Sequence, residues 1–422
     1  MPPSSNEPLL LGESREGRAI HGWLLGSGPL RVSLIAGCHG DEPVSPRFLF
    51  ELVRRLEADP SDPLLGLATL RIVPDANPDA HARNEAWWQE GEGVGNLPAY
   101  LLRRVRELPG DDLEFGFPGA PWGDNGLRPE AVAVARFLSE SGPLDLHGSL
   151  HGLGFGGGPW FLVESAWEDR LDPYREPCLE AAAVEGLTVH DVDRHGEKGF
   201  RRISEGFCTR PDSVSMRNHF LSANDPATAS LFRPSSMEFA RSLGGDPFTF
   251  VSEIPLFLTP VPEDPAWKTR IAGWTSRLVR ADREGRWKEE SELVDSQARA
   301  FGMLPIPLAV QDRLLEVQVR AAVSSLQQAA ELVAAGVEET LCYMNFSREH
   351  WRNLRTKNPL ERVIREVRRW TRVAGAFHDG NSALMLVAAR LLHIAETKWG
   401  KRYMDISQLR AVNAGVEATT AA

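Results

Sequence analysis

Short apolar runs that end in Gly, Pro or Asp alternate with helix-like segments through the first 262 residues. The run RVSLIAG at 31–37 is typical of a buried strand, and the segment PRFLFELVRRLEA that follows it soon after has apolar residues at helical spacing. The runs ATLRIV, LDLHGSLHG and WFLVE also have strand character, and RPEAVAVARFLSES predicts a helix with Pro near its start. This alternation predicts an α/β fold with a mixed, mostly parallel sheet flanked by helices, in which sites lie at the carboxyl ends of strands.

The pattern changes to helices after Pro262. Apolar residues recur at three- and four-residue spacing in ESELVDSQARAF and AVQDRLLEVQVRAAVSSLQQAAELVAAGVEE. A basic stretch follows, because residues 343–410 hold 14 Lys and Arg against 6 Asp and Glu, whereas the whole chain has a net charge of -11. This shift indicates pieces of different origin. We therefore divide the chain into a first domain at 1–262, a helical extension at 263–338 and a C-terminal fragment at 339–422.

Composition disfavours several classes of protein. The net charge of -11 argues against nucleic-acid binding by the protein as a whole. The four cysteines, at positions 38, 178, 208 and 342, have no CxxC spacing, so they indicate neither a disulfide framework nor a cysteine zinc site. The N-terminus has no basic segment followed by an apolar run, and the chain has no stretch of 18 apolar residues. We expect a cytoplasmic protein without a membrane span.

Metal-ligand residue types follow two of the predicted strands. His39 and Glu42 stand three residues apart in AGCHGDEP, directly after the strand at 31–37. Imidazole and carboxylate are both good zinc ligands, and a catalytic zinc needs three protein ligands and an open position for water. The strand LDLHGSLHG offers His147 and His151 as a third ligand, and residues four apart point to the same face of a strand.

The order of these motifs resembles the M14 metallocarboxypeptidases from about residue 10 to residue 260. GESREGRAI at 12–20 is similar to the entry segment of that family, HGDE at 39–42 to its HxxE, NPDAHARN at 77–84 to its NPDG followed by Arg-x-Asn, and RPEAVAVARFL to the helix before its third ligand. The resemblance implies a zinc carboxypeptidase-like fold with one Zn²⁺ per chain. Because the family has Ser-x-His at this point, SLH implies His151 as the third ligand and His147 as a packed histidine.

The resemblance also implies the catalytic groups. Glu253 in SEIPLF corresponds to the family's general base and acid, which accepts the proton of the zinc-activated water and delivers it to the leaving group. Glu238 in SSMEF is the alternative carboxylate. Arg83 corresponds to the arginine that stabilises the oxyanion electrostatically.

One motif departs from the family. Its DLNR recognises the free C-terminal carboxylate of a peptide, whereas this chain has Asp112–Phe115, DLEF, in that place. Glu114 and Phe115 cannot form the bidentate pair that an arginine forms with a carboxylate. Other arginines could take that role, namely Arg128, Arg201, Arg202 and Arg217. The substrate therefore stays open between a peptide and a small amide, including the N-acyl amino acids that related deacylases cleave.

Residues 343–410 resemble the C-terminal end of a Mutator-type insertion-sequence transposase, on the runs EHWRNLRTKNPLER and RRWTRVAGAF. In such enzymes two Asp and one Glu hold two metal ions, and Glu361 corresponds to the Glu. The upstream sequence is not similar to the two aspartate-bearing segments, so the resemblance implies a fragment left by a gene fusion.

Three functions therefore compete at this point. The first is a zinc-dependent peptidase or amidase. The second is a catalytically inactive, M14-like binding protein, which the altered DLEF motif favours. The third is a DNA-binding protein that uses the basic C-terminal stretch, which the overall acidity and the lack of a complete nucleic-acid-binding module disfavour.

Overall fold

A computed structural model describes residues 7–89, 96–120, 126–260 and 265–341. The chain divides into two compact units, residues 1–328 and residues 329–422. The transposase-like stretch at 343–410, with Glu361, lies outside the described residues. The domain bounds at 262 and 338 stay predictions.

The first unit is built around a single sheet of ten strands, counted over the described residues. In chain order the strands are β1 (Leu9–Glu13), β2 (Ala19–Leu25), β3 (Leu30–Ala36), β4 (Ala68–Val73), β5 (Leu146–Gly156), β6 (Trp160–Val163), β7 (Arg202–Ser204), β8 (Phe207–Thr209), β9 (Phe248–Leu258) and β10 (Leu304–Pro305). Their order across the sheet is β1-β2-β4-β3-β5-β9-β6-β8-β7, and β10 pairs with β9.

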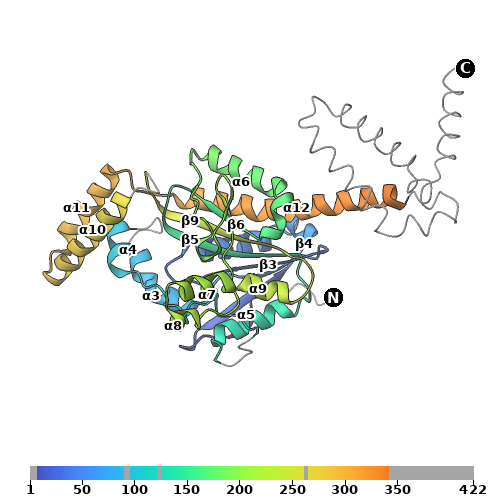
Figure 1. The fold of residues 1–422 in the computed structure, drawn as a ribbon, viewed down its shortest axis with the longest axis horizontal. Coiled ribbons are helices and arrows are strands. Elements are labelled where there is room, and N and C mark those ends of the chain that lie inside the picture. The colour runs from blue at the N-terminus through green and yellow to red at the C-terminus, as the bar shows by residue number, and fades with distance from the viewer. Residues whose placement is uncertain (1–6, 90–95, 121–125, 261–264, 342–422) are drawn as a thin grey trace, which may run out of the picture. The chain divides into compact units, whose positions relative to one another are not determined.

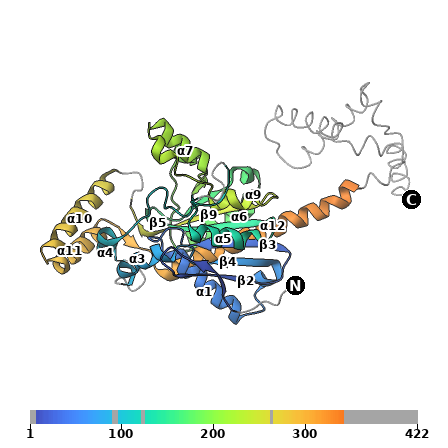
Figure 2. The same cartoon turned by 90° about the horizontal axis from the view of Figure 1, so that it is seen from below.

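Helices lie on both sides of this sheet (Figures 1 and 2). They are α1 (Val44–Ala58), α2 (Pro63–Leu67), α3 (Pro78–Gln89), α4 (Leu97–Arg103), α5 (Pro129–Ser139), α6 (Asp172–Val184), α7 (Ser213–Ser222), α8 (Pro226–Ala229), α9 (Ser236–Ser242), α10 (Pro265–Arg283), α11 (Trp287–Ala300) and α12 (Leu308–Leu341). Two short 3₁₀ helices, η1 (Ser165–Arg170) and η2 (Glu197–Gly199), complete the list.

The predicted fold class is confirmed. The four central strands β4, β3, β5 and β9 run parallel to one another, and antiparallel pairs flank them where β2 meets β4 and β6 meets β9. The C-terminal half of β3 is wholly buried because helices cover both faces of the sheet, which explains its continuous apolar sequence.

Each face of the sheet has its own core. On one face, α1, α6 and α12 pack through side chains such as Phe48, Tyr174 and Leu315, whereas α5 and α9 pack on the other through Phe137 and Phe239. Figure 1 shows α6 and α12 along one side of the sheet and α5 and α9 along the other. This arrangement leaves the carboxyl ends of β3, β5 and β9 at one edge of the layers, where the candidate ligands lie.

The helical extension begins as a hairpin and continues into the core. Helices α10 and α11 pack against each other and against α4 (Figure 2). The N-terminal half of α12 then covers the sheet, and Gln318 Nε2 on its buried face donates a hydrogen bond to Tyr174 Oη (2.7 Å). The first unit therefore includes α12 as far as residue 328.

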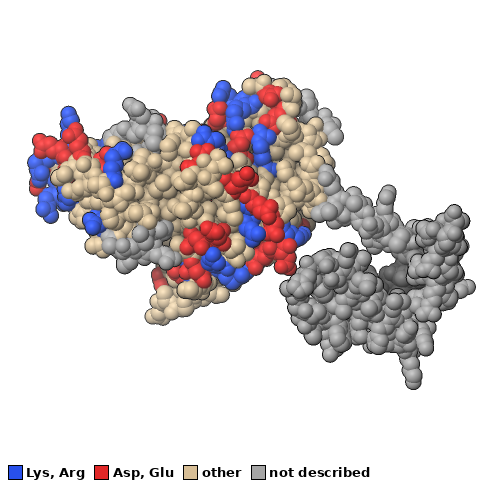
Figure 3. All heavy atoms as spheres, turned by 90° about the horizontal axis from the view of Figure 1, so that it is seen from above, with Lys and Arg blue, Asp and Glu red and all other residues tan. Residues whose placement is uncertain are grey.

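The surface of the first unit carries charges of both signs. On the face drawn in Figure 3, the Lys and Arg side chains of the described residues lie beside Asp and Glu side chains. Within the described part of the chain, no helix combines the length and the apolar character that a membrane span requires.

Candidate metal centre

A tight turn after β3 places His39 and Glu42. Gly37 begins this turn with a φ of +73°, and a Cβ atom there would lie 2.7 Å from Asp75 Oδ1, so the position requires glycine. The turn closes with a hydrogen bond from the Glu42 amide to the His39 carbonyl (3.3 Å). Three residues of separation therefore bring both side chains to the same side of the turn.

The neighbouring parallel strand brings His151 to this turn. β5 pairs with β3, and His151 follows Leu150, the last residue of β5 in register with β3. His151 Nδ1 lies 3.1 Å from His39 Nδ1 and 2.9 Å from Glu42 Oε2, and His39 Nδ1 lies 3.0 Å from Glu42 Oε1. All three side chains are buried. The sequence-predicted ligands thus converge on one point, although they lie up to 112 residues apart.

The three donors fit a zinc ion. A tetrahedral zinc with bonds of about 2.0–2.2 Å separates its ligand atoms by roughly 3.3 Å, which is close to the separations above. Each imidazole also has an acceptor at its other nitrogen, since Asp112 Oδ1 lies 3.0 Å from His39 Nε2 and Ser149 Oγ lies 3.0 Å from His151 Nε2. Protonation at Nε2 leaves both Nδ1 lone pairs directed at the shared point, where a cation stabilises them.

The electrostatics of the centre favour positive charge. Burial opposes protonation of His39, but the carboxylates of Glu42 and Asp112 outweigh it and raise the pKa of His39 to about 9. Burial likewise opposes protonation of His151, whose pKa Glu42 and Glu114 nevertheless raise. The pKa of Asp112 is lowered to about 2 by His39, against the effect of burial. A metal ion must therefore displace protons from these imidazoles in order to bind.

Glu253 faces the same point from β9. It pairs in register with His151, so both side chains leave the same face of the sheet. Its Oε2 atom is buried without a hydrogen-bond partner in the part of the chain that the structure describes. Burial, together with the charge of Glu42, raises the pKa of Glu253 to about 8. The alternative, Glu238, instead caps α9 and accepts bonds from Ser213 and Ser235.

Two arginines lie on the open side of the centre. Arg83 donates to Glu16 (2.9 Å) and lies 3.7 Å from a Glu107 oxygen, so neighbouring carboxylates hold it. Arg106 contacts the centre itself, because it donates to Asp41 and Glu42 and its Nη2 lies 3.0 Å from His39 Nδ1. Sequence reasoning missed Arg106, since it stands in a loop with no motif to mark it.

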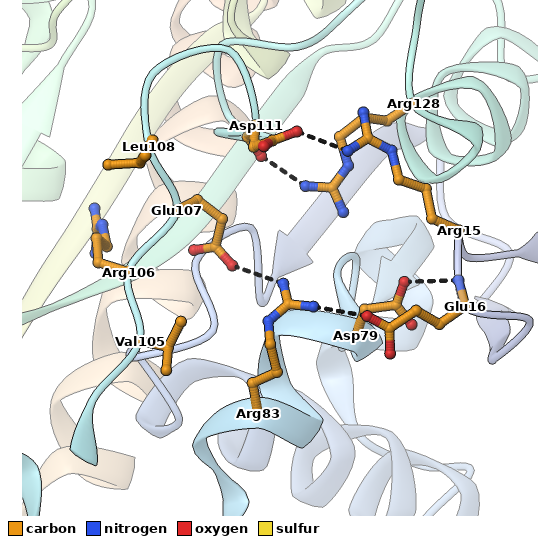
Figure 4. A pocket seen from close by; sticks show the side chains of 10 residues that line it. All are labelled: Arg15, Glu16, Asp79, Arg83, Val105, Arg106, Glu107, Leu108, Asp111 and Arg128. Carbon is orange, nitrogen blue, oxygen red and sulfur yellow. Dashed lines mark hydrogen bonds and ion pairs between the residues drawn. The ribbon is translucent and has the colours of Figure 1, made fainter.

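A pocket of about 350 Å³ opens beside the centre (Figure 4). Its wall combines four arginines and four acids with two apolar side chains, namely Arg15, Glu16, Asp79, Arg83, Val105, Arg106, Glu107, Leu108, Asp111 and Arg128. Arg106 belongs to both the pocket and the centre. A small charged or polar molecule in this pocket would therefore lie next to the candidate metal ligands.

His147 and the residues Glu114 and Phe115 of the DLEF motif are buried in the protein interior. His147 is fully buried, with Ser33 Oγ 2.7 Å from its Nδ1 and Ser236 Oγ 3.1 Å from its Nε2, and burial lowers its pKa to about 4. Glu114 is 4% exposed and hydrogen-bonded, and the ring of Phe115 packs against Phe232.

The four alternative arginines all have partners. Arg128 binds Glu130 and Asn77 and lines the pocket. Arg201, Arg202 and Arg217 contact Glu168, Asp191 and the Phe232 carbonyl, respectively. Of these four, only Arg128 is among the described residues that line the pocket of Figure 4.

Comparison with known proteins confirms the C-terminal resemblance. Residues 308–401 match the family described as "Transposase, Mutator family". The transposase for insertion sequence element IS406 from Burkholderia multivorans is 34% identical over 122 residues, which are 28% of this chain and 31% of that protein. The transposase for IS1081 from Mycobacterium tuberculosis is 33% identical over 159 residues, 36% of each chain. The chain thus spans about a third of the length of these curated transposases.

Solved structures resemble the N-terminal part distantly. Bovine thrombin-activatable fibrinolysis inhibitor is 14% identical with a TM-score of 0.43, covering 76% of this chain and 90% of that one. Carboxypeptidase A from Helicoverpa armigera is 15% identical with a TM-score of 0.40, covering 75% and 68%. A metallo-carboxypeptidase from Burkholderia cenocepacia is 15% identical with a TM-score of 0.39, covering 77% and 65%. Residues 308–401 of the chain are thus similar to Mutator-family transposases, and the solved structures above resemble the chain only distantly.

Proposed function

We propose that the first unit is a metal-dependent hydrolase that cleaves a peptide or small amide bond with water. The observation that carries this proposal is the buried convergence of His39 Nδ1, Glu42 and His151 Nδ1 within hydrogen-bond distance of one another. Glu253 stands beside them with an unpartnered carboxylate oxygen. Three ligands, an acid–base carboxylate and an adjoining pocket are the parts that such a reaction requires.

His39, Glu42 and His151 would hold one zinc ion per chain. Zinc bound there would supply a water of lowered pKa, near 7, and would polarise the carbonyl of the substrate. Glu253 would accept the proton of that water at its unpartnered oxygen and pass it to the leaving nitrogen. A raised pKa suits this work, because a carboxyl group that titrates near neutral pH both takes and returns a proton.

The oxygen that gains negative charge in this reaction needs a fixed cation. The geometry favours Arg106 for this role over Arg83, because Arg106 already contacts two of the proposed ligands. Arg83 lies in the pocket wall between Glu16 and Glu107 (Figure 4), where it would contact the substrate. A guanidinium held in place stabilises such charge without reorganisation during the reaction.

A hydrolysis screen tests the proposal. Free and C-terminally blocked peptides and N-acyl amino acids would be incubated with the full chain, with and without a zinc chelator. We expect cleavage of at least one of these amides, loss of that cleavage with chelator and recovery with added zinc. Glu253→Gln serves as the matched control, because it removes the proton acceptor and leaves the three ligands in place.

A metal-free binding protein is the second candidate. The contact of Arg106 with Glu42 and His39 favours it, since the guanidinium neutralises the same groups that a metal ion would neutralise. Metal analysis of the purified protein separates the two candidates: zinc near one equivalent supports the hydrolase, and a stable protein that takes up no zinc supports the binding protein.

The C-terminal segment has a separate proposal. We propose that it is the remainder of a transposase without transposition activity, because the matched part covers about a third of the curated transposases. We expect DNA binding no tighter than the nonspecific, salt-dependent kind. Sequence-specific binding at physiological salt would contradict this expectation.

A further inference from the structure

Glu114 stands where the M14 resemblance places a substrate-binding residue, but its carboxylate points to the metal ligands. Its Oε2 accepts a hydrogen bond from Ser149 Oγ (2.8 Å) and lies 3.3 Å from His151 Nε2. Its Oε1 accepts bonds from the amide and the hydroxyl of Ser236 (3.0 and 2.7 Å). We propose that Glu114 is a positioning residue that holds His151 with its Nδ1 toward the metal, an inference that rests on the proposed metal site.

The carboxylate of Glu114 fixes the hydrogen-bond roles on one side of His151. Ser149 has one hydroxyl proton, which it donates in the hydrogen bond to Glu114, because an ionised carboxylate can only accept hydrogen bonds. The Ser149 oxygen therefore faces His151 Nε2 with a lone pair, so Nε2 must carry the proton of the ring. When the ring is neutral, as metal binding requires, its lone pair lies on Nδ1, which faces Glu42 Oε2 and His39 Nδ1.

The same assignment continues into the interior. The Ser236 hydroxyl donates its hydrogen bond to Glu114. His147 Nε2 must therefore donate to the Ser236 oxygen (3.1 Å). Ser33 then donates to His147 Nδ1 (2.7 Å). The hydrogen bonds from Glu114 to Ser33 therefore form one network in which each side chain has a partner. Ser236, His147 and Ser33 are fully buried. Hydrogen bonds from the protein interior thus hold the carboxylate of Glu114, and it cannot turn toward the pocket without leaving these partners unsatisfied.

The DLEF motif therefore serves both histidine ligands. Asp112 accepts from His39 Nε2 (3.0 Å), and Glu114, two residues later, orients His151 directly and through Ser149. A carboxylate behind a metal-bound imidazole fixes the ring and raises its basicity, and the loss of such a partner typically lowers metal affinity by roughly 10–100-fold. Glu114, which stands where the family has a residue for the substrate carboxylate, would thus support the proposed ligand His151 instead.

The test is the zinc affinity of Glu114→Gln, measured by competition with a chromophoric chelator. We expect an affinity roughly 10–100-fold below that of the unaltered chain, with one zinc bound at saturation in both. Glu164→Gln is the matched control, because Glu164 is a mostly buried carboxylate paired with Arg210 away from the ligands. Its zinc affinity should stay within about threefold of the unaltered value, well below the loss expected for a supporting carboxylate.

Two further measurements keep the inference testable if Glu114→Gln folds poorly. Ser149→Ala removes the bridging hydroxyl and should also weaken zinc binding, and the visible spectrum of the cobalt-substituted protein should change in both variants because the ligand ring shifts. Unchanged zinc affinity and an unchanged cobalt spectrum in folded Glu114→Gln would overturn the inference while leaving the proposed hydrolase intact. Two zinc ions per chain would also overturn it, since Cys38, Glu114 and His151 lie close enough to act as a ligand set of their own. An unaltered chain that binds no zinc would refute both proposals.

Discussion

Removal of helix α12 is expected to unfold the first unit, although the whole helix lies within the transposase-family match at 308–401. Its N-terminal half packs into the core with four apolar side chains that are at most 2% exposed, namely Leu314, Leu315, Val319 and Val323. Residues beyond 328 belong to the second unit. A chain of residues 1–340 should therefore keep the fold and the metal site, whereas a chain of residues 1–307 should lose both.

The magnitude follows from this burial. Burying one Leu or Val side chain contributes about 1.5–3 kcal/mol, so these four contribute on the order of 6–12 kcal/mol. The truncation also removes the hydrogen bond from Gln318 to Tyr174, which contributes about 0.5–1.5 kcal/mol more. A domain has a net free energy of unfolding of only about 5–15 kcal/mol, so a chain that ends at 307 should have no stable fold.

The assay compares thermal unfolding by circular dichroism and zinc content for the two truncated chains and the full chain. Leu315→Ala in the full chain gives a graded version, with an expected loss of about 2–5 kcal/mol. Its control is Arg313→Ala, which removes an exposed ion pair with Glu185 and should cost no more than about 1 kcal/mol.

Two results would refute this reasoning. If residues 1–307 fold and bind zinc as well as residues 1–340 do, α12 is not an integral part of the first unit. If residues 1–340 unfold or lose zinc, the segment after 340 is an integral part of the first unit's fold, and the interpretation as a fusion remnant is wrong.

Three further predictions concern the centre. His39→Ala and His151→Ala should each abolish the binding of one zinc per chain, since two ligands leave the site incomplete; full zinc content in His151→Ala with loss in His147→Ala would reassign the third ligand. Glu253→Gln should keep zinc and lose about 10²–10⁴-fold in rate, and near-normal hydrolysis would assign proton transfer to another group such as Glu238. His147 should lower the free energy of unfolding by about 3 kcal/mol between pH 6.5 and pH 4, as its own contribution, because its folded-state pKa is lowered to about 4 and the unfolded chain binds that proton first. Urea titrations should therefore show that the free energy of unfolding of His147→Gln approaches that of the unaltered protein as the pH falls. A difference between the two that stays constant with pH would contradict the buried, neutral state of His147.

The sequence by itself determined the parts of this protein that depend on local pattern. The strand at 31–37, the turn that carries His39 and Glu42 and the helix that begins with RPEAV follow from apolar spacing and from Gly and Pro at their ends, which act within a few residues. Parallel strands end at the same edge of a sheet, so the strand ends also predicted where candidate ligands would meet.

Only the tertiary structure decided which side chains support that centre. Glu114 meets Ser236 across 122 residues, and Arg106 meets Glu42 across 64 residues through a loop that carries no motif. α12 likewise packs on a core formed far upstream, while its sequence resembles an unrelated family. Such contacts follow from how the sheet stacks and twists as a whole, and a sequence pattern that repeats over a few residues holds no information about partners a hundred positions away.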